Sequence, residues 1–236
     1  MAEFVHADDY CLGQSTTRKF YEFFLKGYIH KHNNLMGVVQ GFSSLILYDD
    51  SINEEVRENA EQMQTAARSA TELNREILGA TGCARCEPAP MRLSDVLPYW
   101  LGKSAEFCGE KGVAFNHQAA NGLPPVMADS NRLGEVYLHL VRNAAESAAA
   151  FPGGTVTLEL AAAPGGVLIL LHNPSATFDA DGLRRCFLPF ESSKGADHFG
   201  IGLTAAAVLS GDMGVRLALR WENGIMTARL AVPVAA

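Results

Sequence analysis

The stretch YIHKHNNLMGVVQGF at residues 28–42 combines a helical pattern with a cluster of polar side chains. Two histidines and two asparagines fall within residues 30–34. Apolar side chains recur around them at steps of three, four and seven, which predicts an amphipathic helix. These are Phe24, Tyr28, Leu35, Val39, Phe42 and Ile46. A helix that only packs has little use for such a polar cluster, so the histidines are candidates for chemistry.

A second amphipathic helix is expected directly after the first. Ser51 and Glu54 form an S-x-x-E pattern, which is typical of a capping box at a helix start. The apolar rhythm then continues through Val56, Ala60, Met63, Ala67, Ala70 and Ile77. Neither helix has enough partner surface within one chain, so we expect this hairpin, residues 15–80, to pair with a second copy as a four-helix bundle. The sequence therefore predicts a homodimer.

The pattern changes after the breaker-rich linker at 79–90. We expect a helix near 94–110, a strand near 113–117 and a helix over 131–149 capped by Asp129 or Ser130. Residues 154–173 and 215–233 predict two β-hairpins, the second turning at Asn223-Gly224, and helical stretches are expected around 181–187 and 201–211. These elements predict a mostly antiparallel sheet with helices on one face.

Composition narrows the class of protein. The chain has 236 residues and a formal net charge of −7, which argues against nucleic acid or an anionic membrane as the main partner. Its apolar runs are too short to span a membrane, and residues 1–14 lack a signal-peptide pattern. Five scattered cysteines suit a reducing compartment, and Cys83 and Cys86 form a CxxC with no second ligand pair, which favours free thiols. We expect a soluble, cytoplasmic protein.

The two halves in this order resemble the transmitter core of bacterial sensor histidine kinases. That resemblance implies an α+β fold, with a dimerising phospho-acceptor hairpin at 15–80 and a GHKL or Bergerat-type α/β sandwich at 91–236. It also implies two-component signalling with a response-regulator receiver domain as partner. In the family, the phospho-accepting histidine precedes an acidic residue, a variable position and Asn-Asn-Leu. Here that frame begins at His30 and ends at Leu35.

Helical geometry also favours His30 over its neighbour. Counting back three or four residues from Leu35 leads to His32 and Lys31, which are expected on the packed side. His30 lies off that side, beside Asn34 one turn later. A neutral imidazole is a good nucleophile that forms a transferable phosphoramidate, and the Asn34 amide can position water or steady the phosphoryl group.

The second half contains segments that resemble the nucleotide-binding boxes of the family. HLVRNAAES at 139–147 resembles the asparagine box, which implies Asn143 as a ligand of Mg²⁺ with His139 one turn earlier. CFLPFESSK at 186–194 resembles the phenylalanine box, with Phe187, Phe190 and then Lys194. GIGL at 200–203 resembles the second glycine box, where the backbone at Gly200 and Gly202 would cradle phosphates.

Three departures from the family pattern weaken the expected activity. The family carries Asp-x-Gly-x-Gly for the adenine, whereas HNPSA at 172–176 places His172 and Asn173 there; losing the charged acceptor costs about 1.5–3 kcal/mol. Lys31 replaces the acidic residue that helps to deprotonate the histidine. The loop before Gly200 is short, and His198 replaces a glycine. We therefore expect binding of ATP and Mg²⁺ to be weak or absent.

Three functions remain open from the sequence. The first is a working histidine kinase that autophosphorylates His30. The second is a histidine phosphotransferase that exchanges phosphate with receiver aspartates without ATP. The third is a non-catalytic dimeric scaffold that binds a regulator. We predict a histidine-kinase-like phosphorelay protein with His30 as the phosphate carrier.

Overall fold

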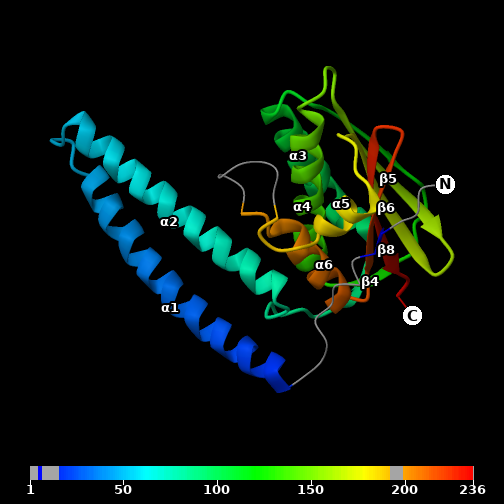
Figure 1. Cartoon of the computed structure of the whole chain (residues 1–236), viewed down its shortest axis with the longest axis horizontal. Helices are drawn as coiled ribbons and strands as arrows, with labels where there is room; N and C mark the ends of the chain where they lie inside the picture. The colour runs from blue at the N-terminus through cyan, green and yellow to red at the C-terminus, as the bar shows by residue number, and fades with distance from the viewer. Residues whose placement is uncertain (1–4, 7–15, 192–198, 236) are drawn as a thin grey trace. The chain divides into compact units, whose positions relative to one another are not determined.

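The computed structural model describes residues 5–6, 16–191 and 199–235 (Figure 1). The chain divides into two compact units. One covers Gly13–Cys83, and the other combines Met1–Leu12 with Ala84–Ala236. Among the described residues, no helix is both long and apolar enough to cross a membrane.

The first unit is a helical hairpin of α1 (Thr16–Leu47) and α2 (Glu54–Ala80) (Figure 1). Both predicted helices are confirmed, but the predicted capping box at Ser51 is wrong. The Asp49 carboxylate accepts hydrogen bonds from the Ser51 backbone N–H and hydroxyl, at 2.8 and 2.6 Å, which holds Ser51 in the turn. Asn53 is the cap instead, and its side-chain oxygen accepts from the backbone N–H of Val56 at 2.9 Å.

The apolar residues of α1 divide between two faces. Ile29 of α1 is buried, and the buried positions of α2 recur every seven residues at Ala60, Ala67 and Asn74. Leu35, predicted to lie on the packed stripe, is 61% exposed. The same holds for Phe24, Tyr28 and Phe42 of that stripe. Small residues thus close the hairpin within one chain, and most large residues of the predicted stripe lie outside it.

The second unit is built on a six-stranded sheet in the order β1-β7-β8-β6-β5-β3. The β3–β5 pair is parallel and all other pairs are antiparallel, as the mostly antiparallel prediction required. A separate two-stranded sheet pairs β2 (Ala89–Met91) with β4 (Val126–Ala128). The strands of the large sheet are β1 (Val5–His6), β3 (Ala114–Ala119), β5 (Thr155–Ala163), β6 (Gly166–Pro174), β7 (Arg216–Glu222) and β8 (Ile225–Pro233).

Helices cover one face of this sheet, which confirms the predicted α+β class (Figure 1). They are α3 (Leu93–Glu110), α4 (Ser130–Ala148) and α6 (Gly202–Asp212), with the short α5 (Ala180–Arg185) beside them. Alternate residues of the strands point into the core beneath the helices, including Leu158, Ile169, Leu171 and Leu230. This alternation decides which side chains of β6 reach the helix side, and therefore which can contribute to a site there.

Candidate functional site

The structure separates the two histidines of α1. His30 and Asn34 are both exposed, one turn apart on the same face. His32 and Asn33 are partly buried and turn towards α2. The predicted inward position of His32 is confirmed, whereas Lys31, also predicted to face inwards, is exposed. The outer face of this turn therefore presents an imidazole and an amide side by side.

Asn74 of α2 binds the inner side of the same turn, and sequence reasoning missed it. Its side chain is buried, at 3% exposure. Its amide nitrogen lies 2.6 Å from Oδ1 of Asn33 and 2.8 Å from Nδ1 of His32. The signal was present in the sequence, because Asn74 continues the seven-residue series of Ala60 and Ala67 as its one polar member.

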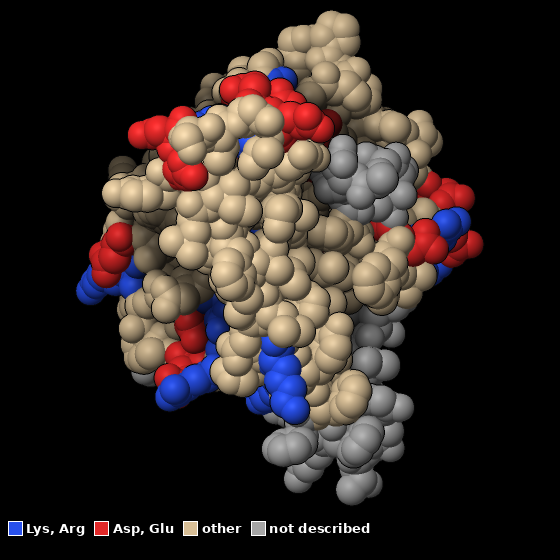
Figure 2. All heavy atoms as spheres, turned by 90° about the vertical axis from the view of Figure 1, so that its left-hand side faces the viewer, with Lys and Arg blue, Asp and Glu red and all other residues tan. Residues whose placement is uncertain are grey.

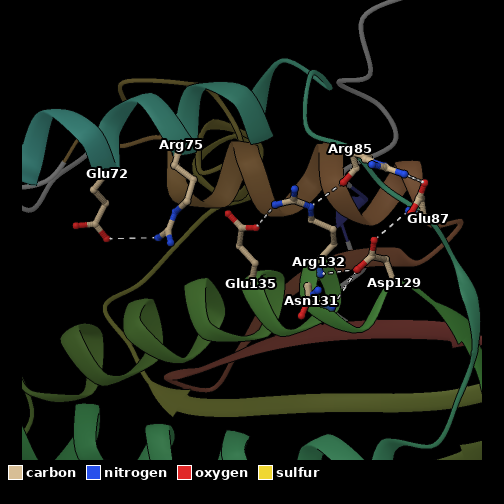
Figure 3. A network of polar contacts seen from close by, with 8 residues as sticks. All are labelled: Glu72, Arg75, Arg85, Glu87, Asp129, Asn131, Arg132 and Glu135. Atoms are coloured by element: carbon tan, nitrogen blue, oxygen red, sulfur yellow. Dashed lines mark hydrogen bonds and ion pairs between the residues drawn. The ribbon is translucent and has the colours of Figure 1, made fainter. Parts of the chain in front are cut away.

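In the second unit, the start of α4 is fixed by Asp129, one of the two predicted caps (Figure 3). Oδ1 of Asp129 accepts from the backbone N–H of Asn131 and Arg132, at 3.0 and 3.1 Å, and Oδ2 accepts from that of Glu87 at 2.9 Å. Burial opposes ionisation of Asp129, but these hydrogen bonds and the Arg132 charge lower the pKa of its carboxyl. The cap sets the helical phase of the later turns that carry His139 and Asn143.

Two of the predicted nucleotide residues meet where α4 contacts α6. His139 is buried at 7% exposure, and a Cβ on Gly202 would lie only 3.1 Å from its Nδ1. Gly202 therefore permits the close approach of the two helices. Asn143 lies one turn further along α4 and is partly buried. Gly200 has φ +66°, and its carbonyl accepts from the backbone N–H of Phe190 at 2.9 Å.

The two phenylalanines before Gly200 have opposite environments. Phe187 is buried, and its carbonyl accepts from the Thr204 hydroxyl at 2.9 Å, which ties this segment to α6. Phe190 is 70% exposed and has φ +64°, an uncommon conformation for a residue other than glycine. Lys194 and His198 lie outside the described residues.

His172 lies away from the other predicted nucleotide residues, contrary to its expected role. Odd-numbered residues of β6, such as Leu171, point into the core under the helices, so His172 points to the opposite face. There its Nδ1 lies 3.0 Å from the Thr227 hydroxyl, and its Nε2 lies 3.8 Å from the Glu159 carboxylate. Burial lowers the pKa of His172, the Glu159 carboxylate opposes this, and the Arg220 charge adds to it.

Asn173 is the residue that β6 presents to the helix side. It is 5% exposed, and its amide nitrogen donates to the Pro174 carbonyl at 2.8 Å. The hydroxyl of Ser147 on α4 donates to the same carbonyl at 3.2 Å, which links the end of β6 to α4. Asn173 thus lies on the side of the sheet that carries His139 and Asn143, whereas His172 does not.

Comparison with known proteins gives a consistent relationship. No family model matches the sequence. The chain is 31% identical over 158 residues to the sensory histidine kinase/phosphatase NtrB of Rhizobium leguminosarum bv. phaseoli. The match covers 61% of this chain and 41% of NtrB, so the chain spans less than half the length of this relative.

Solved structures of histidine kinases share the fold. Full-length ShkA, in complex with AMPPNP, superposes with a TM-score of 0.76 at 23% identity, over 90% of this chain and 46% of ShkA. ThkA, in complex with the response regulator TrrA, superposes with a TM-score of 0.62 at 15% identity, over 95% of this chain and 68% of ThkA. The chain is thus similar over part of its length to a sensory histidine kinase/phosphatase, and its helical hairpin and α/β unit share the fold of solved histidine kinases.

Proposed function

We propose that this protein carries a phosphoryl group on His30 and exchanges it with an aspartate of a response-regulator receiver domain. The observation that carries this proposal is the exposed His30, one turn from the exposed Asn34, on the outer face of a hairpin of this family. Such a face is accessible to a receiver, and ThkA has been solved with its response regulator.

The chemistry of the exchange follows from imidazole. A neutral ring nitrogen of His30 attacks the phosphorus of the receiver's aspartyl phosphate, and a P–N bond forms. The P–O bond to the aspartate breaks, the carboxylate leaves, and the second ring nitrogen gives its proton to solvent. Asn34 lies within a turn and its amide would donate to a phosphoryl oxygen. Lys31, exposed beside His30, offers a positive charge to the incoming phosphate.

The hairpin also supports a homodimer. Its largest exposed apolar side chains follow a heptad-like spacing on α1, and α2 adds two more. They are Phe24, Tyr28, Leu35, Val38, Phe42 and Leu45 on α1, with Val56 and Met63 on α2. Figure 2 shows the side of the molecule that lies at the left of Figure 1, where residues other than Lys, Arg, Asp and Glu cover much of the surface and charged side chains form separate groups. A second hairpin would bury the apolar stripe in a four-helix bundle.

The second unit retains part of a nucleotide site. Asn143 would supply an oxygen ligand to Mg²⁺, Gly200 and Gly202 would let phosphates approach the start of α6, and Asn173 would face the base. The fit is incomplete, because the buried Asn173 amide is neutral and its nitrogen already donates to Pro174. When bound, ATP would supply the phosphoryl group. We infer weak nucleotide binding and a phosphotransferase rather than an efficient autokinase.

The test compares two phosphate donors. Purified protein is incubated with radiolabelled MgATP or with a labelled phospho-receiver domain, in parallel with His30→Ala. We expect label from the receiver on the wild type, little from ATP, and none on the variant. Rapid label from ATP would establish a kinase instead. If neither donor labels the protein while receiver binding survives in His30→Ala, the protein is a scaffold and the proposal is wrong.

A further inference from the structure

Two histidines lie two residues apart on α1, yet a defined phosphate carrier requires one nucleophile. Both imidazoles have the same intrinsic chemistry, and exposure alone does not silence His32, whose side chain is only partly buried. The difference between them lies in their partners. His32 contacts the amide of Asn74, and its ring stacks on Tyr28 with 5.8 Å between the centroids.

The contacts of Asn74 fix the tautomer of His32. The Asn74 amide nitrogen carries two hydrogens and has no lone pair to accept with. One hydrogen goes to Oδ1 of Asn33, which can only accept, at 2.6 Å. The other points to Nδ1 of His32 at 2.8 Å, so Nδ1 must be the acceptor. A neutral imidazole has one N–H and one lone pair, and therefore Nε2 of His32 carries the proton.

This arrangement leaves His32 without a lone pair for attack. We propose that Asn74 is the residue that determines which histidine is phosphorylated, by engaging the nucleophilic nitrogen of His32 and leaving His30 as the reactive imidazole. The inference deepens the proposed function, since it rests on His30 as the phosphate carrier. Asn74 touches no reacting atom and is a positioning residue. Its hydrogen bond to Asn33 holds the amide in the orientation that His32 requires.

The selectivity can be measured without ATP or a receiver. Potassium phosphoramidate is a small phosphoryl donor for histidine: a ring nitrogen attacks phosphorus, the P–N bond to ammonia breaks, and the imidazolium formed releases a proton to the buffer. At about pH 8 imidazoles are largely neutral. Digestion of the labelled chain, followed by fragmentation of its peptides in the mass spectrometer, then reports phosphate on His30 and on His32 separately.

We expect the wild type to be labelled at His30 and hardly at His32. In Asn74→Leu, and in the milder Asn74→Ala, the ratio of His32 to His30 labelling should rise about tenfold, the factor that corresponds to the loss of one hydrogen bond. The matched control is Gln64→Leu. It removes another contact between the helices, from the Gln64 amide to the Ser44 hydroxyl at 2.8 Å, and should leave the ratio unchanged.

A second readout needs no variant. In the ¹⁵N-histidine-labelled wild-type protein, long-range ¹H–¹⁵N correlation spectra should show His32 as the Nε2–H tautomer, with an unprotonated Nδ1 that accepts a hydrogen bond. A Nδ1–H tautomer, or equal labelling of His30 and His32 in the wild type, would overturn the proposal. Failure of a phospho-receiver to label the protein would count against the proposed function alone, because neither readout uses a receiver.

Discussion

Two pairs of nearby polar residues can be compared, one in the turn at residues 30–34 of α1 and one at the end of β6. In each pair the two side chains point to opposite sides of the helix or strand. On α1, His30 faces outwards while His32 reaches Asn74. On β6, Asn173 faces the helices while His172 reaches Thr227. The sequence resolved the first pair because helical spacing was applied to it. The pair on β6 was misassigned because the family motif was aligned by position alone. The alternation of side chains between the two faces of a strand was not considered.

The largest effect should come from the pair on α1. His30→Ala should abolish phosphate transfer from a labelled phospho-receiver, because it removes the nucleophile. His32→Gln should retain most of the transfer rate, since an amide oxygen there can still accept from Asn74. Rates are measured by acid-labile and base-stable label on the protein. Loss of transfer in both variants, with folding intact by circular dichroism, would remove the distinction between the two faces.

The pair on β6 is tested by restoring a carboxylate at each position. Asn173→Asp should increase MgATP affinity about tenfold, because a charge-assisted hydrogen bond to the adenine amino group replaces a neutral one. His172→Asp should not, because it places its carboxylate on the other face of the sheet. Isothermal titration calorimetry measures both. A gain in His172→Asp with none in Asn173→Asp would restore the motif-based assignment.

Most of the fold was predictable because its elements carry local signals. Helices α3 and α4 and the hairpin at Asn223-Gly224, whose residues have φ of +50° and +79°, appear where periodicity and turn chemistry placed them. The short strands β1, β2 and β4 were missed. Two or three residues show no alternation, and their pairing depends on distant partners such as β7.

The site was predictable only where one element determines it. The exposure of His30 and Asn34 follows from the phase of α1 alone. The role of Asn74 required the register between two helices, with 41 residues separating it from Asn33. Likewise, the contact between His139 and Gly202 depends on how α4 packs on α6. Such contacts arise from tertiary packing, which local patterns do not encode.

The caps of α4 and α2 provide a smaller contrast between the two units. Asp129→Ala should lower the free energy of unfolding of the second unit by about 1–2 kcal/mol, because three backbone N–H groups lose their acceptor. Asn53→Ala removes one such bond in the hairpin and should cost about 0.5–1 kcal/mol. Urea unfolding near pH 7, followed by near-ultraviolet circular dichroism for the second unit and far-ultraviolet for both, measures the two losses.

The pH dependence of the stabilisation by Asp129 tests the same cap of α4. Because its pKa is lowered in the folded protein, its contribution is complete above the ordinary carboxyl range and is lost as pH falls through the folded pKa. The difference between wild type and Asp129→Ala should therefore shrink below about pH 4. A difference that stayed constant in acid would mean that the charge of the cap does not contribute.

The smallest expected effect concerns His172 on the outer face of β6. Its pKa is lowered from 6.5, chiefly by burial, so as pH falls the unfolded chain takes up the proton first. The contribution of neutral His172 to the stability of the second unit is then complete above the ordinary histidine pKa. It decreases as pH falls towards the pKa of His172 in the folded protein. His172→Gln, which can still bond to Thr227, should flatten the stability profile between about pH 7.5 and 5.5. A profile unchanged by the substitution would show that the Glu159 carboxylate compensates the burial of this ring.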